Sequence, residues 1–303
     1  MVILKVIGGL GNQMFEVAFA RMLALEFNEK IYLDCSVYDK YKIRNFSLSH
    51  LNISEYIDYI ENANLKKYEK IYLKISQKIY HIYQKFIKII KNNDRIGEEP
   101  YKLLMKYGLI YNFDVYYYNF INNNNKIKCL YGYFQSEKYF KKYKNNIIKE
   151  LKVKTNATEL ERELIEEIKK NNSVGVSIRL GDDYINSSEL NVCNKEFYYK
   201  GMDYIYNKNK DSIFYIFSDD VDRVKNLFEF KYPVKFIEGF KDYQSLRLLY
   251  SCKNFIISNS SFSWWGAYLS ENKDKLIVAP SKWYNSSKER PDIYYEEMIT
   301  INI

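Results

Sequence analysis

Short apolar runs alternate with longer amphipathic segments along the second half of the chain. The runs have the length of buried strands, and in the segments between them apolar residues recur every three or four positions, as in helices that face a core. We predict strands at 174–178, 212–217, 234–239, 254–258 and 275–280. We predict helices at about 157–171, 195–208, 221–228 and 243–252, and one within 259–270. Strands that alternate with helices imply a parallel sheet with crossover helices, so this half has an α/β pattern.

The chain begins with another unit of this kind. Residues 2–7 predict a strand, a helix is expected over about 12–27, and a second strand over 30–34. A glycine-rich stretch separates the first strand from the helix. The pattern is that of a β-α-β unit with a glycine-rich first turn.

The middle of the chain has a different character. Residues 40–150 are mostly helical in pattern and rich in Tyr, Lys and Asn, with a loop expected at 121–126. The alternating pattern starts only after Glu150. We therefore predict two Rossmann-like domains, the first over 1–150 with a helical insertion and the second over 151–303.

The segment 65–93 predicts one long amphipathic helix. Its apolar residues form one stripe, made of Tyr68, Ile71, Tyr72, Ile75, Ile79, Ile82, Tyr83, Phe86 and Ile90. Its lysines lie largely elsewhere around the helix, at Lys67, Lys70, Lys74, Lys78, Lys85 and Lys88. Two interpretations stay open: a stripe packed on the core with a solvated basic face, or a surface for anionic lipid headgroups. Nucleic acid is a weaker third, because no motif for reading bases accompanies the charge.

Composition and charge narrow the class of protein. The 303 residues carry a net charge of +8, with 47% hydrophobic and 28% charged residues, as in globular proteins. No apolar stretch approaches the roughly 20 residues of a membrane-spanning helix, and the first residues lack the basic and apolar regions of a signal peptide. Four scattered cysteines and two histidines argue against a Cys/His zinc site and favour reduced thiols in the cytoplasm.

Four polar stretches follow predicted strands. They are GGLGN at 8–12, RLGDDY at 179–184, SDD at 218–220 and NSSFSWW at 259–265. Ligands of parallel α/β sheets bind beyond the carboxyl ends of the strands. Four such stretches at this edge predict a site for a phosphorylated, polar ligand.

Each stretch also has a plainer interpretation. Arg179 offers a planar fork of N–H donors to a phosphate, or it forms a salt bridge with Asp182 or Asp183 across the turn. The serines of 259–265 begin a helix whose N–H groups favour an anion, or they are an ordinary cap above core tryptophans. The carboxylates of 218–220 bind a divalent metal, cap the next helix, or bind a base or sugar. The glycine-rich stretch has neither the Walker A nor the dinucleotide spacing, but it lets a backbone approach a ligand closely.

Together these stretches resemble the signature blocks of the bacterial alpha-1,2-fucosyltransferases, glycosyltransferase family 11. The blocks, in the family's order, are GGLGNQMFEVAFARMLA, SIRLGDDY, FYIFSDD, NFIISNSSFSWWGAYLS and VAPSKWY. The resemblance runs from end to end except in the lysine-rich middle. It implies a GT-B-like architecture, with two Rossmann-like domains around a cleft, an acceptor side at 1–150 and a GDP-sugar side at 151–303. It also implies GDP-fucose as donor, an inverting reaction and no required metal.

The phosphate-binding motif of the family reads H-x-R-x-G-D-Y. On this chain its arginine is Arg179, its glycine Gly181 and its aspartate Asp182. The chain departs from the motif twice, because Ser177 stands at the histidine position and Asp183 is an additional residue before the tyrosine. We expect Arg179 to neutralise the diphosphate as the sugar bond breaks. One of the two aspartates is expected to orient Arg179 or to take the proton of the acceptor hydroxyl.

These expectations give a list of site residues and a leading hypothesis. The catalytic residues expected are Asp182, Arg179 and Asp183. The donor-binding residues expected are Gly9, Gly11, Asn12, Arg179, Ser218, Asp219, Asn259, Ser260, Ser261 and Phe262. The leading hypothesis is transfer of fucose to the 2-hydroxyl of a galactose-like residue of a surface glycan. The enzyme would be cytoplasmic, with peripheral contact to the inner face of an anionic membrane through 65–93 and no nucleic-acid partner.

Two alternatives to this hypothesis stay open. The same fold could use a different nucleotide-sugar donor. The chain could also be an inactive nucleotide- or glycan-binding protein, for which the only hint is Ser177 at the histidine position.

Overall fold

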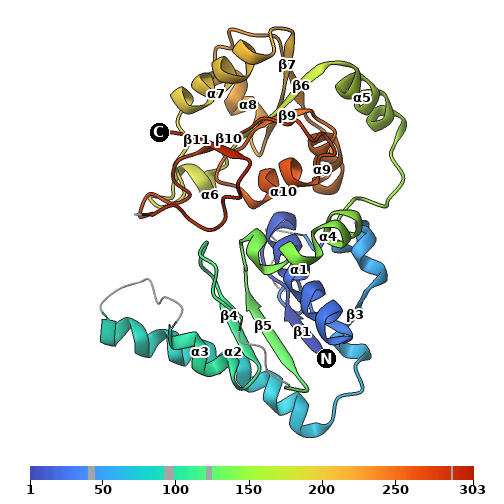
Figure 1. The fold of residues 1–303 in the computed structure, drawn as a ribbon, viewed down its shortest axis with the longest axis vertical. Helices are drawn as coiled ribbons and strands as arrows, with labels where there is room; N and C mark the ends of the chain where they lie inside the picture. Colours follow the sequence, from blue (N-terminus) through green and yellow to red (C-terminus); the bar gives the residue numbers. More distant parts are fainter. Residues whose placement is uncertain (40–44, 92–98, 121–124, 288) are drawn as a thin grey trace. The chain divides into compact units, whose positions relative to one another are not determined.

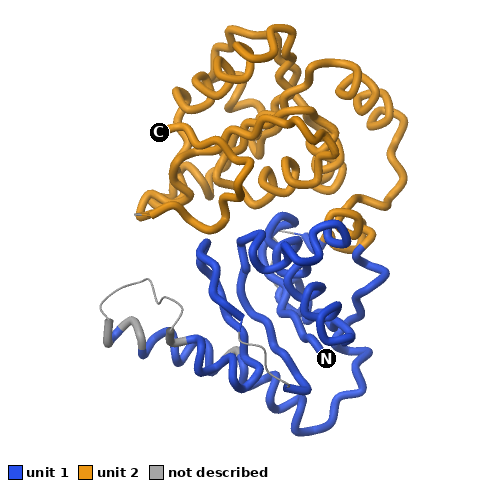
Figure 2. Tube along the Cα trace, in the orientation of Figure 1, with its two compact units in different colours: residues 1–46, 53–147 blue, residues 47–52, 148–303 orange. Residues whose placement is uncertain are grey.

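The protein consists of two compact units, each with its own parallel sheet and packed helices (Figure 1). The computed structural model describes residues 1–303 except 40–44, 92–98, 121–124 and 288. Unit 1 comprises residues 1–46 and 53–147, and unit 2 comprises residues 47–52 and 148–303 (Figure 2). The short segment 47–52 thus belongs to the unit that holds the second half of the chain.

Unit 1 is built on five parallel strands in the order β3-β2-β1-β5-β4. The strands are β1 Val2–Lys5, β2 Ile31–Asp34, β3 Ile57–Tyr59, β4 Leu109–Asn112 and β5 Lys128–Gly132. The helices are α1 Leu10–Phe27, α2 Lys67–Lys91, α3 Glu99–Met105 and α4 Lys144–Glu150, the last of which continues into unit 2. Short 3-10 turns lie at Ile60–Asn62, Glu137–Tyr139 and Lys141–Tyr143 in unit 1, at Leu48–His50 in the segment of unit 2, and at Asn52–Glu55, where the chain returns to unit 1. The first strand, β1, therefore lies inside the sheet, with later strands on both sides of it.

The predicted β-α-β unit at the start of the chain is confirmed by β1, α1 and β2. Helix α1 is buried along most of its length because its large apolar residues face the sheet and the chain that follows β5. The ring of Phe19 lies 4.8 Å from that of Phe134, and the ring of Phe15 lies 6.3 Å from that of Phe140, between centroids. This packing holds the glycine-rich turn after β1 on a rigid helix.

Residues 40–150 were expected to be mostly helical, but they contain three strands, β3, β4 and β5. For these strands the expectation is wrong. Each has only three to five residues, and the strong helical period of α2 dominates the pattern around them. Strand β5 is also hard to recognise in the sequence, because it contains a charged residue. Lys128 is 1% exposed, and its Nζ pairs with Glu29 Oε1 at 2.8 Å. The loop expected at 121–126 falls mostly outside the described residues.

Helix α2 confirms the predicted long helix but not the packing of its whole apolar stripe on the core. Tyr72, Ile79 and Tyr83 are half-buried. Five other members of the stripe are exposed, namely Tyr68, Ile71, Ile75, Ile82 and Phe86, and the side chain of Ile90 lies outside the described part of the chain. The stripe is wider than the surface that the sheet offers, and the tyrosine edge of the helix occupies that surface.

Unit 2 contains six parallel strands in the order β11-β10-β9-β6-β7-β8. The strands are β6 Asn172–Ile178, β7 Ser212–Ser218, β8 Val234–Ile237, β9 Asn254–Ile256, β10 Ile277–Pro280 and β11 Met298–Ile301. The helices are α5 Glu159–Lys170, α6 Asp182–Ile185, α7 Lys195–Lys208, α8 Val221–Leu227, α9 Asp242–Tyr250 and α10 Ser261–Leu269. The α/β pattern predicted for this half is confirmed, while the short α6 and the last strand, β11, were not predicted.

Close backbone packing fixes α9 and α10 near β6. A Cβ atom added to Gly175 would lie 2.6 Å from Leu249 Cδ1, and one added to Gly266 would lie 2.3 Å from Leu249 Cδ2. Both glycines therefore make room for one leucine of α9, which sits between β6 and α10. The start of α10 is held against the middle of the sheet as a result.

Candidate functional site

The carboxyl ends of three strands lie side by side in the middle of the unit 2 sheet. Ile178, the last residue of β6, is in register with Ser218 of β7, and Val176 is in register with Ile256 of β9. Strand β6 is the first of the unit and has β7 on one side and β9 on the other. Ligands of α/β sheets bind at such a switch point, and the polar turns after these three strands are brought together there, as the sequence predicted.

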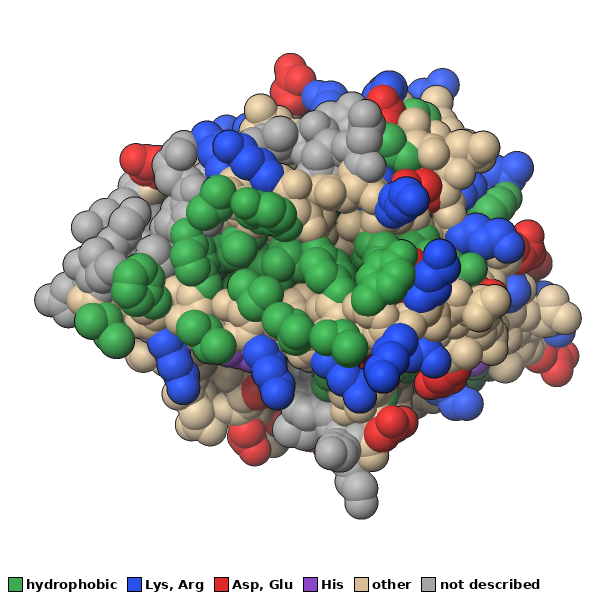
Figure 3. Space-filling view, turned by 90° about the horizontal axis from the view of Figure 1, so that it is seen from below, with side chains coloured by type: hydrophobic (Ala, Val, Ile, Leu, Met, Phe, Trp, Pro, Cys, Tyr) green, Lys and Arg blue, Asp and Glu red, His purple; other side chains and the backbone are tan. Residues whose placement is uncertain are grey.

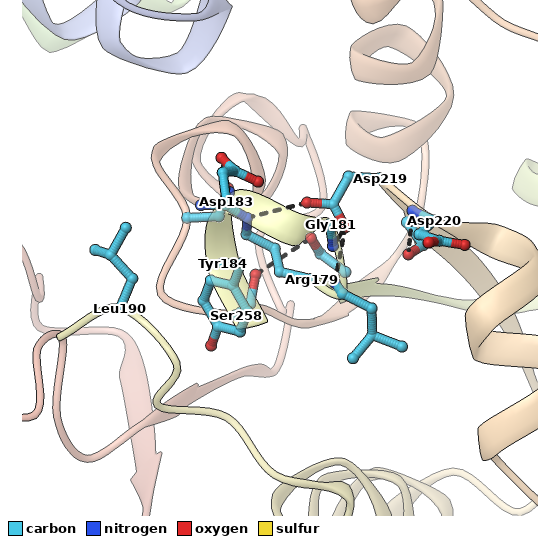
Figure 4. Close-up of polar contacts among 12 residues, drawn as sticks. Arg179, Gly181, Asp183, Tyr184, Leu190, Asp219, Asp220 and Ser258 are labelled. Carbon is cyan, nitrogen blue, oxygen red and sulfur yellow. Dashed lines mark hydrogen bonds and ion pairs between the residues drawn. The ribbon is translucent and has the colours of Figure 1, made fainter. Parts of the chain in front are cut away.

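Arg179, the first residue after β6, is braced by two carboxylates and a ring. Its Nη2 lies 3.0 Å from Asp183 Oδ2, and its Nε lies 3.3 Å from Asp219 Oδ2 (Figure 4). The guanidinium carbon lies 4.9 Å from the centroid of the Tyr184 ring, a cation–π contact. The salt bridge to Asp183 that the sequence left open is therefore present. The side chain remains 19% exposed, so its orientation is fixed while part of it can still meet a ligand.

The carboxylate of Asp219 accepts hydrogen bonds from the backbone of this turn. Its Oδ1 accepts hydrogen bonds from the backbone N–H groups of Leu180 at 2.8 Å and Gly181 at 3.0 Å, while its Oδ2 faces Arg179. Two adjacent backbone N–H groups and a guanidinium thus converge on one carboxylate, an arrangement that binds anions in general. A Cβ atom on Gly181 would lie 2.9 Å from Asp219 Oδ2 and 3.0 Å from Asp183 Oδ1. A larger residue here would therefore displace the two carboxylates that face Arg179.

The two adjacent aspartates of the turn have different partners. Asp183 contacts Arg179, whereas Asp182 Oδ1 lies 3.1 Å from both Nη1 and Nη2 of Arg223. Asp182 is the more exposed of the two, with 79% of its side chain accessible against 53% for Asp183. One carboxylate braces the arginine of the motif, and the other projects further into solvent.

Arg223 was not predicted, and it brings a second cation to this edge. It lies in α8, and its Nη1 also donates to the carbonyl of Leu180 at 2.7 Å. Its Nε lies 3.3 Å from Asp220 Oδ2. The sequence signal was present in the spacing of Asp220 and Arg223, three residues apart at a helix start, but the link back to Leu180 depends on the register of β6 and β7.

The residues of the SDD stretch, 218–220, have different roles: one caps helix α8 and another accepts hydrogen bonds from the turn after β6. Asp220 is the N-cap residue of α8, and its Oδ1 accepts the N–H of Arg223 at 2.9 Å. Ser218 Oγ accepts the N–H of Asp220 at 3.0 Å. The capping interpretation is confirmed for Asp220, while Asp219 serves the turn after β6. In the part of the chain that the structure describes, no three His, Cys, Asp or Glu side chains cluster as a metal site would require.

Asn259 lies beneath the site as a buried anchor. Its Oδ1 accepts a hydrogen bond from the Tyr184 hydroxyl at 2.7 Å, and its Nδ2 donates to the carbonyls of Leu190 and Trp283 at 2.9 and 2.8 Å. The same hydroxyl accepts the N–H of Cys193 at 3.0 Å. Burial raises the pKa of the Tyr184 phenol, so this side chain stays neutral. Asn259 thereby fixes the ring on which Arg179 rests.

The serines around the start of α10 border the same edge. Ser260 is the N-cap residue, and Ser261 and Phe262 form the first turn, all three half-exposed. Ser177, at the histidine position of the motif, points its Oγ to Ser258 Oγ at 3.5 Å. The next residues of the helix, Trp264 and Trp265, are fully buried, so the interpretation of the tryptophans as core residues is confirmed.

The residues expected in unit 1 lie around the turn after β1. The carbonyl of Gly9, the N-cap residue of α1, accepts the N–H of Asn12 at 2.9 Å, and Asn12 Oδ1 accepts a hydrogen bond from Gln135 Nε2 at 2.9 Å. Gly11 is buried in the first turn of α1. Gly8 has φ +75°, and a Cβ atom there would lie 2.8 Å from Asn12 Nδ2. The positive φ favours glycine at that position, and a Cβ atom would displace the Asn12 side chain.

One carboxyl group lies under this first turn. Glu16 in α1 is fully buried, its Oε2 accepts the N–H of Ile7 at 3.1 Å, and its Oε1 has no hydrogen-bond partner in the described part of the chain. Burial raises the pKa of Glu16 well above its usual value. Residues 8–15 contain no Lys or Arg, so this turn has no side-chain cation of its own.

Known proteins match this chain over almost its whole length. The model of glycosyl transferase family 11 matches residues 1–302. The alpha-1,2-colitosyltransferase of Escherichia coli is 30% identical over 293 residues, which are 94% of this chain and 92% of that protein. The O-antigen biosynthesis glycosyltransferase WbnK of Escherichia coli is 30% identical over 305 residues, which are 93% of this chain and 95% of that protein.

A solved structure shows the same fold. NodZ alpha-1,6-fucosyltransferase, co-crystallized with GDP, superposes with a TM-score of 0.51 at 14% sequence identity, covering 88% of this chain and 91% of that one. The architecture of two α/β units with parallel sheets is therefore GT-B-like.

Proposed function

Since the chain belongs to glycosyl transferase family 11, we propose that it transfers fucose from GDP-β-L-fucose to the 2-hydroxyl of a galactose-like residue. The acceptor residue is part of a surface glycan, and inversion at the sugar carbon gives an alpha-1,2 linkage. The protein is a glycosyltransferase with a GT-B-like fold. The donor, the acceptor and the linkage are the proposed part.

The observation that carries this proposal is the group of donors around Asp219. The N–H groups of Leu180 and Gly181 and the guanidinium of Arg179 converge on its carboxylate. A diphosphate offers more oxygens and more negative charge than one carboxylate, so it competes well for the same donors. We expect the diphosphate to take the place of Asp219 at the backbone N–H groups. The released carboxylate and Ser218 can then bind the ribose or the base.

In the proposed reaction, the acceptor hydroxyl oxygen attacks C1 of fucose while the bond from C1 to the β-phosphate oxygen breaks. The electron pair of that bond leaves with GDP, and the proton of the hydroxyl goes to a carboxylate. Arg179 stabilises the charge that develops on the leaving group. Its braces, Asp183 and the Tyr184 ring, hold it in place before the substrate arrives, so little reorganisation is needed.

We assign the proton acceptor to Asp182. It is 79% exposed, and it occupies the aspartate position of the motif, whereas Asp183 is engaged with Arg179 at 3.0 Å. The pair with Arg223 orients the carboxylate of Asp182 without burying it. Asp183 is then a positioning residue that acts through Arg179.

The other expected donor-binding residues receive supporting roles. The first turn of α10, with Ser261 and Phe262, places the positive end of the helix at the phosphate oxygens, while the N–H of Ser260 donates to the carbonyl of Ser258 at 2.8 Å. Asn259 acts from below by fixing the Tyr184 ring. Gly9, Gly11 and Asn12 lie in a stretch, 8–15, whose own residues include no Lys or Arg, which suits an approach of the backbone to an uncharged part of the substrate.

These roles fit an enzyme in which one domain binds the donor and the other the acceptor. They also fit a reaction that needs no metal. In the proposal, residues 151–303 bind the GDP-sugar and residues 1–150 bind the acceptor. Two arginines at the phosphate site supply positive charge that a divalent cation supplies in other transferases. We place the enzyme in the cytoplasm, at the inner face of the membrane, with no nucleic-acid partner.

A second donor is favoured by one specific observation. One relative with 30% identity is named for colitose rather than fucose, so a GDP-linked sugar other than fucose fits the same family. The phosphate and nucleoside contacts proposed above would be the same for both donors. Only the pocket for the sugar would differ.

A donor panel tests the proposal. The purified protein is incubated with a β-galactoside and with GDP-fucose, GDP-colitose, GDP-mannose or UDP-galactose, and the product linkage is determined by NMR. The proposal expects transfer from GDP-fucose to the 2-hydroxyl of galactose. Transfer from GDP-colitose alone would establish the second donor, and transfer from UDP-galactose alone would contradict the GDP site.

A further inference from the structure

Helix α2 packs on unit 1 with a tyrosine face. Tyr80 is 4% exposed, and the centroid of its ring lies 5.0 Å from that of Tyr111 and 5.2 Å from that of Tyr131. Ser76, one turn earlier, is also buried, and its carbonyl accepts a hydrogen bond from the Tyr111 hydroxyl. This face anchors α2 to β4 and β5, so the helix has a fixed rotation about its axis.

An adjacent face of α2, turned about the helix axis from the tyrosine face, presents a line of large apolar side chains to solvent, here called the α2 stripe. Its members are Tyr68 at 59% exposed, Ile71 at 47%, Ile75 at 44%, Ile82 at 67%, Phe86 at 56% and Ile89 at 82%. They recur at intervals of three, four and seven residues, so they form one line along the helix. At 1.5 Å per residue the line is about 30 Å long. Isolated exposed apolar residues are ordinary, but a continuous line of this length marks an interaction surface.

Lysines border the α2 stripe. Helix α2 contains seven Lys and one Glu, and five of its lysines are described as exposed, namely Lys67, Lys70, Lys74, Lys78 and Lys85. A turn of 100° per residue places these five beside the stripe on one flank. Within the described parts of the chain, no acidic side chain is paired with them. Figure 3 shows the hydrophobic side chains of this face as a band with Lys and Arg side chains along its edges.

We propose that the α2 stripe and its lysines dock this protein on the surface of an anionic lipid bilayer. An amphipathic helix with large apolar residues on one side and lysines beside them lies in the membrane interface, with its apolar face among the upper acyl chains. The lysines then meet the anionic headgroups. Among the described residues no helix is long and apolar enough to cross a membrane, so the contact is interfacial.

The exposed apolar line and the lysines beside it together indicate which kind of partner covers this surface. A second copy of this chain could cover the apolar residues, but two α2 helices would bring like charges together, which is unfavourable. Nucleic acid would use the lysines and leave Ile82, Phe86 and Ile89 in water. An anionic bilayer satisfies both features, because it has an acyl region for the stripe and phosphate groups for the lysines. The inference depends only on this surface and not on the identity of the donor.

An added tryptophan reporter tests the docking directly. The native tryptophans, Trp264, Trp265 and Trp283, are at most 2% exposed and lie in unit 2, so they give a constant background. Phe86→Trp adds a reporter in the α2 stripe, and Leu160→Trp adds a control at equal exposure, since both side chains are 56% exposed. Vesicles of phosphatidylcholine and phosphatidylglycerol are added without donor or acceptor. We expect a blue shift, and quenching by lipids brominated in the acyl chain, for Phe86→Trp alone.

The contribution of the lysines is measured by vesicle sedimentation. Near an anionic surface each lysine contributes about fivefold to binding, so the triple change of Lys74, Lys78 and Lys85 to Gln is expected to weaken it about 100-fold. The matched control changes three exposed lysines of unit 2 to Gln, namely Lys169, Lys170 and Lys208. Binding of the unmodified protein is expected to fall with added salt and on pure phosphatidylcholine. An equal loss in the control variant would overturn the assignment to α2.

The contribution of the apolar line is measured with Ile82→Gln/Phe86→Gln, which is expected to weaken vesicle binding at least tenfold. Both side chains are exposed, so the melting temperature should not change. The control is Leu160→Gln/Leu227→Gln in unit 2, at 56% and 44% exposed. Absence of binding by the unmodified protein at low salt would overturn the proposal. So would a dimer in solution that Ile82→Gln/Phe86→Gln dissociates, because a second copy would then cover the stripe.

Discussion

The turns after β1 and after β6 have the same place in their sheets and opposite chemistry. Each follows the first strand of its unit, which lies inside the sheet with later strands on both sides. The turn after β6 holds Arg179, and Arg223 lies beside it, each paired with carboxylates at 3.0 to 3.3 Å. The turn after β1 has no Lys or Arg within its own residues 8–15, and Glu16, which follows it in α1, is buried.

The difference teaches that topology alone does not define a phosphate site. Both turns place glycine at the edge of a parallel sheet, and in both a Cβ atom would meet a neighbouring side chain at 2.8 to 2.9 Å. Among the described residues, the guanidinium groups and the two convergent N–H donors belong to the turn after β6. We therefore assign the diphosphate to unit 2, and each test below separates the two turns.

The largest expected effect comes from Asp182, with its neighbour Asp183 as the comparison. Asp182→Asn should lower kcat by about 100- to 10,000-fold, because it removes the proposed general base, and should leave the affinity for GDP nearly intact. Asp183→Asn should be mild. Steady-state kinetics and GDP titrations of both variants check this. A large loss of GDP affinity in Asp182→Asn, or a severe loss of kcat in Asp183→Asn alone, would show that the roles are exchanged.

The second-largest effect is expected from Arg179, whose guanidinium offers a planar fork of hydrogen-bond donors. Arg179→Lys keeps the charge and loses the planar set of donors, so kcat should fall by about 100- to 1,000-fold. The fold should survive, because the side chain lies at the surface of the sheet edge. Arg162→Lys on the exposed face of α5 is the control and should have wild-type kinetics. Near wild-type turnover by Arg179→Lys would leave the arginine as a structural ion pair.

The turn after β1 should respond in stability rather than in turnover. The folded-state pKa of Glu16 lies above its unfolded value because of burial, so this carboxyl lowers stability as pH rises from its unfolded pKa towards its folded one. Glu16→Gln keeps the acceptor for the Ile7 N–H and removes the charge. Its melting temperature should exceed that of the wild type by several degrees near neutral pH, and the gain should shrink below about pH 4.5. A lower melting temperature at neutral pH would mean that the ionised carboxylate has a partner.

The smallest expected effect is that of chelation. Activity should be unchanged in excess EDTA, because the proposal gives the charge stabilisation to Arg179, Arg223 and the start of α10. Initial rates with and without EDTA, and with added manganese, check this. Loss of activity with rescue by manganese would instead make Asp219 and Asp220 metal ligands.

The sequence predicted most of unit 2 because its elements are regular. Strand β6 is a run of small and apolar residues, and each helix around it has a clear period, so the pattern alone gave the parallel sheet. The turn residues could also be listed, since parallel strands end at one edge. The pairing of Asp182 with Arg223, and that of Leu180 with Asp219, could not be predicted. Both depend on the register of β6 and β7, which no local pattern encodes.

Unit 1 was less predictable because contacts between residues far apart in the sequence determine its elements. Strand β5 contains the buried Lys128, whose partner Glu29 is 99 residues away in the sequence, so the strand does not look apolar. In α2 the apolar stripe was visible, but Tyr80, which packs on Tyr111 and Tyr131, lies outside that stripe. Exposure of Phe86 and Ile89 became apparent only when the sheet face was known.

The most direct test of the central claim is a calorimetric cycle with two nucleotides and two proteins. GDP and GMP differ in the β-phosphate, so their difference in affinity measures what the phosphate site contributes. We predict that the wild type binds GDP at least tenfold more tightly than GMP, which is about 1.4 kcal/mol, and that Arg179→Lys removes most of this difference. An unchanged preference for GDP in Arg179→Lys, with Arg162→Lys as control, would contradict the assignment of the diphosphate to the turn after β6.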